Sequence, residues 1–346
     1  MNPLTFGAPV SVHPQVDPLD DLQWADRQPG IEGAWLIDHL QGWFPRGTDG
    51  GVLEDPHQLL DPLSLLAAGA VRTERVALGV AVTDPLRRSS VALAQGASTI
   101  SWLGQRPMRL GVGAGDPGQL RPFGLHSGRE RTGRLDYVRP ALRQLDELRT
   151  ADPSATGLGI AEVSGYELYV AAHGPRMLEL AATHADGWLP TTVSPKVYRE
   201  KLDHLRAHAE SIGRDPGTIR PTLFTWSALA PTARESRALL AHPSVRAVAL
   251  YRGPAGFAAH GASYPLEHSY VPDEVPPDQA TGLLAAIPDA VVADAVLHGS
   301  PEEVREQLQE YHDAGCEHVI FNDIGRFTDP EGTERFRTAL MDLTRW

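Results

Sequence analysis

The chain has 346 residues, of which 42% are hydrophobic, and a formal net charge of −13. This acidic balance argues against a surface that binds nucleic acid or an anionic membrane. The one cysteine, Cys316, cannot form an internal disulfide, which fits a reducing cytoplasm. No apolar run is long enough to cross a membrane, and we expect no signal peptide, because the N-terminal residues lack a charged start and a long apolar stretch. We therefore expect a cytoplasmic protein.

Apolar, strand-like runs alternate along the chain with segments of helical period. Eight runs are predicted strands: Leu4–Val10, Gly33–Ile37, Val76–Val82, Met108–Gly113, Leu168–Ala172, Gly187–Pro190, Thr222–Ala228 and His318–Asn322. Seven segments are predicted helices: Leu59–Ala68, Ser90–Leu103, Arg131–Leu148, Pro175–His184, Lys196–Ile212, Thr232–Leu240 and Pro301–Ala314. Interleaved strands and helices in this number are typical of an α/β fold, the parallel (β/α)8 TIM barrel. A doubly wound sheet is the alternative.

Two longer segments interrupt this rhythm, at 117–130 and 251–279. Loops of this length in compact domains are usually lids, binding loops or disordered segments. The second segment carries the aromatic residues Tyr251, Phe257, Tyr264 and Tyr270. These aromatic residues favour an ordered lid over disorder. Because no linker or repeat divides the chain, we predict one domain over residues 1–346 with two insertion loops.

The segment Trp35–Pro45 ends an apolar run with Asp38 and His39, and Trp43 follows shortly after. Buried strands carry apolar residues, so a carboxylate and an imidazole at the tip indicate that the tip faces a polar pocket. In a parallel barrel the strand tips form the site. The alternative is a loop aspartate that caps the next element, followed by a surface histidine.

The segment Leu110–Asp116 is rich in glycine and follows an apolar strand. It is not the dinucleotide fingerprint, because the third glycine comes too early and no helix follows at once. The glycines indicate a strand tip at which the backbone passes close to a flat ligand, with Asp116 at the rim. The alternative role for Asp116 is that of a turn residue before Pro117-Gly118.

The segment Ala171–Met177 joins a predicted strand to a predicted helix. Gly174 permits a tight turn, and Pro175 suits the first helical turn. The free amides and positive dipole of such a helix start suit a phosphate, although an ordinary strand-to-helix joint has the same pattern. We expect no metal site. His204 and His208 lie four residues apart, but the glutamate of the zinc-binding helix pattern is missing.

Several segments together resemble one known superfamily: Ile37–Trp43, Leu78–Arg88, Leu110–Asp116, Val170–Met177 with Ala185–Pro190, and His298–Val304. Over nearly its whole length, the chain resembles the luciferase-like flavin and deazaflavin oxidoreductases, which are TIM barrels. Within this superfamily it is most similar to the branch that uses coenzyme F420. That branch includes the F420-dependent glucose-6-phosphate dehydrogenases and the phthiodiolone-type ketoreductases, and the Ala171–Met177 run points to the ketoreductase-like subgroup.

The resemblance implies a cofactor site at Asp38, His39, Ala81, Val82, Thr83, Gly113, Ala114, Ala172, His173, Gly174 and Pro175. It implies that the family's non-proline cis peptide lies at Ala81–Val82. It also implies that the amides of the Gly174-Pro175 turn bind the phosphate of the cofactor. Two positions depart from the sugar-phosphate dehydrogenases. Asp116 stands where those enzymes often have glutamate, and His173 stands where they tend to have glycine.

The implied reaction is hydride transfer between C5 of coenzyme F420 and a ketone or other polarised double bond of a small organic substrate. His39 is the first candidate proton donor, because its intrinsic pKa lies nearest neutrality. Asp116 is the second candidate, either as an acid with a raised pKa or as the residue that orients His39. Trp43 is expected to shield the site or to stabilise charge, with plain packing as its alternative role.

The alternative function is an FMN-dependent luciferase-like monooxygenase, which would use FMN in place of coenzyme F420. A barrel that has lost its cofactor and a metal-dependent hydrolase are further alternatives. The resemblance also implies a homodimer, although the sequence does not locate its interface. Neither the substrate nor the direction of the reaction follows from the sequence.

Overall fold

The computed structural model describes residues 3–125, 133–150, 165–191 and 193–345. Its strands are β1 (Thr5–Pro9), β2 (Ile31–Leu36), β3 (Ala77–Thr83), β4 (Arg109–Val112), β5 (Glu167–Val170), β6 (Gly187–Trp188), β7 (Arg220–Leu229), β8 (Leu297–Gly299) and β9 (His318–Asp323). The strand order β6-β5-β4-β3-β2-β1-β9-β7 is closed by parallel pairing of β6 with β7. Closure excludes the open doubly wound sheet and confirms the predicted (β/α)8 barrel.

Each of the eight predicted strand runs overlaps a strand of the barrel. The ninth strand, β8, is not predicted, because three residues are too few to show a period. It pairs with Ser227–Leu229 at the end of β7. Cys316, two residues before β9, is fully buried, and burial raises the pKa of its thiol to about 12. A buried thiol of this kind behaves as a small apolar side chain rather than as a nucleophile.

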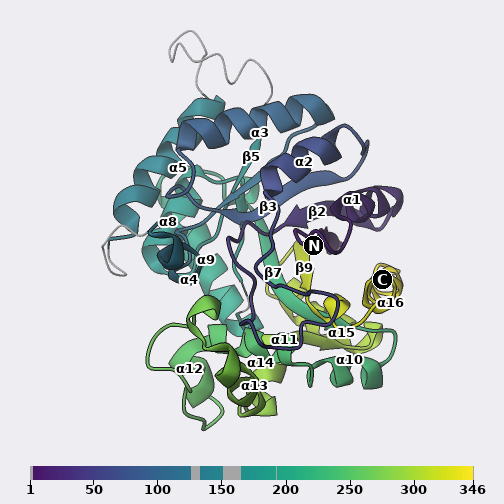
Figure 1. Cartoon of the computed structure of the whole chain (residues 1–346). Helices are drawn as coiled ribbons and strands as arrows, with labels where there is room; N and C mark the ends of the chain where they lie inside the picture. Colours follow the sequence, from purple (N-terminus) through teal and green to yellow (C-terminus); the bar gives the residue numbers. More distant parts are fainter. Residues whose placement is uncertain (1–2, 126–132, 151–164, 192, 346) are drawn as a thin grey trace.

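Helices surround the barrel (Figure 1). The predicted helices correspond to α2 (Pro62–Ala70), α3 (Ser90–Gly104), α5 (Leu135–Thr150), α8 (Pro175–His184), α9 (Pro195–Ser211), α10 (Ala233–Leu239) and α15 (Pro301–Asp313). Two further helices were not predicted, α1 (Pro18–Arg27) and α16 (Gly332–Leu343). The start of α1 did carry a signal, since Asp17 accepts hydrogen bonds from the amides of Leu19 and Asp20 and Pro18 begins the helix. The start of α16 has no side-chain cap.

The two predicted insertion loops contain short helices. They are α4 (Pro117–Leu120) and η1 (Arg121–Phe123) in the first, and α12 (Gly253–Ala258), η4 (Pro272–Glu274) and the start of α13 (Pro277–Ala285) in the second. Residues 126–130 of the first loop lie outside the described residues. Along the chain, α11 (Pro243–Arg246) and η3 (Ala247–Arg252) come just before the helices of the second segment, and α14 (Asp289–Ala295) follows them. Together these helices build a second hydrophobic cluster, which is why the segment is ordered.

The described residues also contain two further single turns of 3-10 helix, η2 (Pro216–Thr218) and η5 (Gly325–Phe327). None of the helices in the described part of the chain has both the length and the apolar character that a membrane crossing requires.

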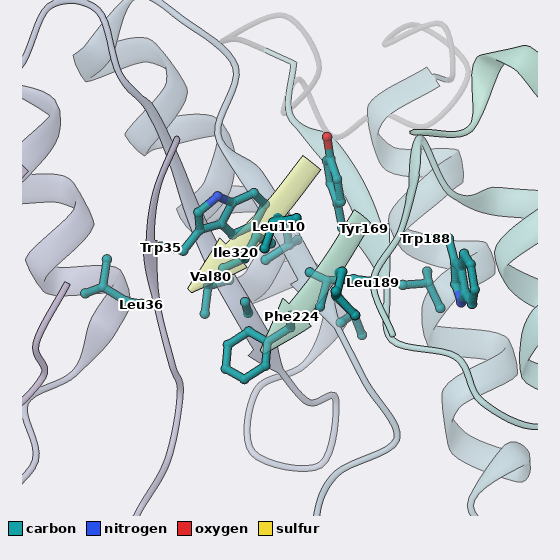
Figure 2. Close-up of a cluster of buried hydrophobic side chains, with 14 of the residues drawn as sticks. Trp35, Leu36, Val80, Leu110, Tyr169, Trp188, Leu189, Phe224 and Ile320 are labelled. Carbon is teal, nitrogen blue, oxygen red and sulfur yellow. The ribbon is translucent and has the colours of Figure 1, made fainter. Parts of the chain in front are cut away.

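Trp35 fills the interior of the barrel on the side of the strand starts. Added Cβ atoms at Gly33 and Gly79 would lie only 2.6 and 2.3 Å from its indole. The indole Nε1 donates a hydrogen bond of 3.1 Å to Nε2 of buried His318, the first residue of β9. Figure 2 shows Trp35 in one cluster of buried side chains with Leu110. The glycines therefore make room for a packed barrel interior, and the strand ends remain available for a site.

We predict that Gly79→Ala lowers the free energy of unfolding by about 1–3 kcal/mol, because the added methyl group overpacks the space of the indole. Urea denaturation measures the change. Gly282→Ala in α13 is the matched control, since no atom lies within 4 Å of its added Cβ. That control is expected to stabilise the protein by up to about 1 kcal/mol through helix propensity. Equal effects of the two substitutions would show that Trp35 does not fill the space tightly.

Candidate active site

A cavity of about 970 Å³ opens at the C-terminal ends of the barrel strands. Its wall includes eleven of the predicted site residues: Asp38, His39, Ala81, Val82, Thr83, Gly113, Ala114, Asp116, His173, Gly174 and Pro175. These residues come from the ends of β2, β3, β4 and β5, which parallel pairing brings to one rim. The structure therefore gathers residues that lie more than a hundred positions apart in the chain around a single space.

Asp38 is held by a buried network of charges. Its Oδ1 lies 3.0 Å from Nη1 of Arg87, and Arg88 pairs with its other oxygen. The Nε of Arg87 lies 2.6 Å from Oδ2 of Asp84, and the side chains of Arg87 and Asp38 are only 7% and 2% exposed. A carboxylate this fully paired is not free to act as a base. These ion pairs join the end of β2 to the segment after β3.

His39 faces the cavity without a hydrogen bond to any described residue, and its Nδ1 is buried. Burial, together with the charge of Arg87 and the neighbouring His13, lowers the pKa of His39 to about 3. The imidazole is therefore neutral at physiological pH, with one nitrogen as a donor and the other as an acceptor. This corrects the reason given for His39 as a proton donor, because its ordinary pKa near neutrality does not apply in this site.

Asp116 combines the two roles that its position suggested. Its Oδ1 accepts a hydrogen bond of 3.0 Å from the amide of Gly118, so it caps α4. It also lines the cavity, where its side chain is open to the central space. The surrounding walls raise its pKa by desolvation, against smaller opposite effects of the Gly118 amide and Arg134. A carboxyl group with a raised pKa beside a cavity is a candidate proton carrier.

Two of the predicted site residues, Trp43 and Ala172, do not line the cavity. Trp43 is 1% exposed and belongs to the second cluster, where its Nε1 donates to the carbonyl of Ser244 over 2.8 Å. The indole that lines the cavity is Trp226 of β7, whose centroid lies 6.3 Å from that of Trp43. Trp43 lies outside the wall because the chain after β2 turns away from the barrel and packs against α11.

Ala172 also points away from the cavity. Its side chain is fully buried, and its carbonyl accepts a hydrogen bond of 2.9 Å from Nε1 of Trp188. The neighbours on either side, Ala171 and His173, line the cavity. Side chains alternate along an extended segment, so only every second residue faces the site.

The peptide bond between Ala81 and Val82 is cis, which confirms the conformation that the resemblance implied. Both residues and the following Thr83 line the cavity. At Gly111 an added Cβ would lie 2.2 Å from the carbonyl oxygen of Val80, and at Gly113 it would lie 2.9 Å from Cγ2 of Val82. Gly111 and Gly113 therefore make room for β3 and its side chains, and Gly113 also lines the cavity.

The helix α8 begins at the opposite part of the rim. Its cap residue, Gly174, provides no side-chain hydrogen bond to the first turn, and an added Cβ there would meet no atom within 4 Å. Arg176 in that turn lines the cavity. Lys201 donates to the carbonyl of His173. Burial lowers the pKa of the His173 imidazole to about 4, and the charge of Lys201 adds a smaller effect in the same direction. Uncapped amides, a helix dipole and two cations suit an anionic group.

Several residues of the wall were not predicted from the sequence. They include Asp84, Arg87, Arg134, Phe224, Trp226, Val248 and Ala295, whereas Tyr251 and Arg252 belong to the predicted segment 251–279. Trp226 lies in the middle of a strand, and Val248 and Ala295 lie in helical segments that carry no motif. The two consecutive arginines after the predicted third strand were the available signal for Arg87.

In the described residues we find no group of three or more His, Cys, Asp or Glu side chains arranged to hold a metal ion. His204 and His208 lie on α9, outside the wall of the cavity.

Comparison with known proteins identifies the family. The family model for luciferase-like monooxygenases matches residues 25–318. The chain belongs to this family. The luciferase-like protein is 28% identical over 327 residues to a phthiodiolone/phenolphthiodiolone dimycocerosates ketoreductase of Mycobacterium kansasii, with 84% of this chain and 86% of the relative covered. It is 30% identical over 340 residues to an F420-dependent glucose-6-phosphate dehydrogenase of Nakamurella multipartita, with 93% and 91% covered. The protein is therefore an oxidoreductase.

Solved structures confirm the fold of this luciferase-like oxidoreductase. An F420-dependent secondary alcohol dehydrogenase in complex with an F420-acetone adduct matches with a TM-score of 0.69 at 17% identity, over 98% of this chain and 99% of that chain. The coenzyme F420-dependent tetrahydromethanopterin reductase of Methanopyrus kandleri matches with a TM-score of 0.70 at 18% identity, over 97% and 99%.

His13 lies behind the wall of the site in the luciferase-like barrel. Its ring centroid lies 5.7 Å from that of Trp43 and 5.5 Å from that of Phe327, both in edge geometry. Burial is the main reason that its pKa is lowered to about 4. The unfolded chain therefore binds a proton at this residue below about pH 6.5, whereas the folded chain does not. The contribution of His13 to stability falls as the pH drops from 6.5 to 4.

We predict that His13→Phe flattens the pH dependence of stability, because phenylalanine keeps the ring packing and removes the titrating group. Between pH 6 and 4.5, the slope of unfolding free energy against pH is expected to fall by about 1 kcal/mol per pH unit. Urea denaturation at several pH values measures this slope. The exposed His204 provides the control, since His204→Gln should leave the slope of the wild type. An unchanged slope in His13→Phe would contradict the prediction.

Proposed function

We propose that the protein binds coenzyme F420 and transfers a hydride between the deazaflavin ring and a ketone or other polarised double bond. The observation that carries the proposal is one continuous cavity that joins the uncapped start of α8 to the neutral His39. The relatives support it by their names, since one is a ketoreductase and another is named for dependence on F420. The name of the ketoreductase relative favours reduction of a ketone to an alcohol as the direction of the proposed reaction.

The residues of the cavity suit a flat ring with an anionic tail. The first turn of α8, with Arg176 and Lys201 close to it, offers positive charge to a phosphate. Small side chains at Ala81, Gly113 and Ala114 leave a broad wall for a planar ring next to Val82. When bound in reduced form, the coenzyme supplies the hydride. The protein supplies the binding, the orientation of the substrate and the control of protons.

His39 is suited to polarise a carbonyl group rather than to act as a strong acid. A neutral imidazole can donate its N–H to an oxygen that gains negative charge, and it need not lose its proton in doing so. Asp116, whose pKa is raised by desolvation, is the residue that we propose to supply the proton to the product oxygen. Trp226 takes over the covering role first expected of Trp43, because it lines the cavity and its ring centroid lies 6.5 Å from that of His39.

We also propose that the protein is a cytoplasmic homodimer that pairs through α2 and α3. The two helices pack side by side on the outside of the barrel (Figure 1) and contain no charged residue, although the chain carries a net charge of −13. Four exposed large hydrophobic residues lie on or next to them: Leu60, Val71, Val91 and Trp102. Val71 and Trp102 are 62% and 54% exposed. A neutral apolar face can pair with its own copy without charge repulsion.

The cofactor and the role of His39 can be tested together. Titration of the purified protein with coenzyme F420 and with FMN, followed by fluorescence quenching, should show binding of coenzyme F420 at lower concentration. His39→Ala should leave the F420 dissociation constant within about threefold, while kcat/KM for a ketone falls by about 10²–10⁴-fold, because a polarising donor is lost.

The conservative variant His39→Asn serves as the matched control, since its amide keeps an N–H donor and should retain part of the lost rate. Preferential binding of FMN, with oxygen consumption in the presence of reduced FMN, would instead favour the monooxygenase alternative. Turnover by His39→Ala at the wild-type rate would remove His39 from the mechanism.

The dimer can be tested by placing a charge on the uncharged face. Trp102→Glu should convert the wild-type dimer to a monomer in size-exclusion chromatography with light scattering, because two buried carboxylates would meet at the interface. Ile212→Glu is the control, since Ile212 is 47% exposed at the end of α9 and away from this face. A wild-type protein that is monomeric at micromolar concentration would contradict the proposal.

A further inference from the structure

We infer that the substrate is an uncharged carbonyl compound with a largely apolar body, which lies in a chamber on the β7 side of the cavity. The inference rests on the proposed function and specifies the class of substrate. The chamber is formed by Phe224, Trp226, Val248, Tyr251 and Ala295. These five residues, called here the aromatic chamber, come from β7, from η3 and from the end of α14.

The rings of the aromatic chamber form a continuous wall beside His39. Trp226 meets Phe224 edge to face with 6.1 Å between centroids, and it lies nearly parallel to Tyr251 at 6.2 Å. On its other side Tyr251 meets Tyr270 edge to face at 5.0 Å. The rings are therefore fixed by one another, and the chamber is a preformed surface rather than a flexible one.

The described cations that line the cavity are either neutralised or lie on its opposite side. Arg87 is paired with Asp38 and Asp84, and Arg252 pairs with Asp294. Arg134 and Arg176 come from the segments that follow β4 and β5, where the coenzyme is proposed to lie.

The polar groups at the chamber itself carry no charge. His39 is neutral, and burial keeps the pKa of Tyr251 well above its usual value, with a smaller effect of Asp116 in the same direction. An anionic group in the aromatic chamber would lose its hydration without gaining an opposite charge, which disfavours binding. A ketone avoids this cost, because its oxygen can accept from His39 while its apolar part contacts the rings.

A series of 2-alkanones from acetone to 2-octanone tests the inference. With reduced coenzyme F420, kcat/KM should rise by about fourfold for each added methylene until the chamber is filled, as expected for full burial of a CH2 group. Dissociation constants of the same ketones, measured by calorimetry on the full chain with and without oxidised coenzyme F420, should fall by a similar factor. A flat or falling dependence on chain length would overturn the inference.

The charge argument has its own probe. 2-Oxooctanoate differs from 2-octanone by a carboxylate in place of the terminal methyl group beside the ketone, and it should bind at least about 100-fold more weakly. Equal or tighter binding of the anion would show that the chamber provides an uncompensated positive charge, and this result would overturn the inference.

A variant pair locates the effect. In Ala295→Leu, kcat/KM should stop rising at an alkanone about two methylene groups shorter than in the wild type, because the larger side chain takes up space in the chamber. Ala285→Leu makes the same substitution at an exposed position of α13 and should leave the series unchanged. Thermal melting verifies that both variants fold. An unshifted plateau in folded Ala295→Leu would place the apolar group elsewhere and contradict the inference.

Failure of this inference is distinguishable from failure of the proposed function. If coenzyme F420 does not bind but calorimetry shows affinity rising with ketone chain length, the chamber is supported and the cofactor is not. If coenzyme F420 binds and ketones bind without regard to chain length, the proposed cofactor stands and the chamber is rejected.

Discussion

The guanidinium of Arg87 lies between the carboxylates of Asp38 and Asp84 and so ties the end of β2 to the end of β3. Buried charges of this kind are tolerated only when each has its partner, and removal of one leaves a costly unpaired charge. The same guanidinium donates to the backbone carbonyl of Asp38 over 2.6 Å, which fixes the chain directly before His39. Its positive charge also contributes to the lowered pKa of the imidazole. Arg87 therefore helps to fix the position of His39 and adds to the effect of burial on its protonation state.

Hydrogen bonds connect three loops that surround the cavity. Oε1 of Gln119 accepts hydrogen bonds from the amides of Leu40 and Gln41 over 2.8 and 3.0 Å, and Gln41 in turn donates to the carbonyl of Gly118. The amide of Asp273 donates to the side chain of Gln41. The loops after β2, β4 and β7 thus share hydrogen bonds, which gives the rim of the site a defined shape before any ligand binds.

The long connection after β7 supplies what the barrel alone lacks. Its helices bury Trp43 and support Trp226 from behind, and the hydroxyl of Tyr270 donates to the carbonyl of Trp43 over 3.0 Å. One half of the cavity is therefore polar, with an uncapped helix start and cations from the segments after β4 and β5. The other half is aromatic and uncharged. This division suits the proposed pairing of an anionic coenzyme with an apolar ketone, because charged groups and apolar surface disfavour one another.

The barrel and the rim could be predicted from the sequence because both depend on local patterns. Apolar runs of strand length and the polar residues after them, such as Asp38-His39 and Gly174-Pro175, are visible within a few positions. The far wall could not be predicted in this way. Trp226 and Trp43 are both indoles in apolar surroundings, and only the packing of the chain after β2 against α11 decides which of the two faces the cavity. The neutral state of His39 likewise depends on burial and on Arg87, 48 residues further along the chain. The sequence by itself thus determined the fold class and most of one rim, whereas tertiary contacts decided the charge of the central histidine and the character of the opposite wall, because both arise from groups that approach only when the barrel closes.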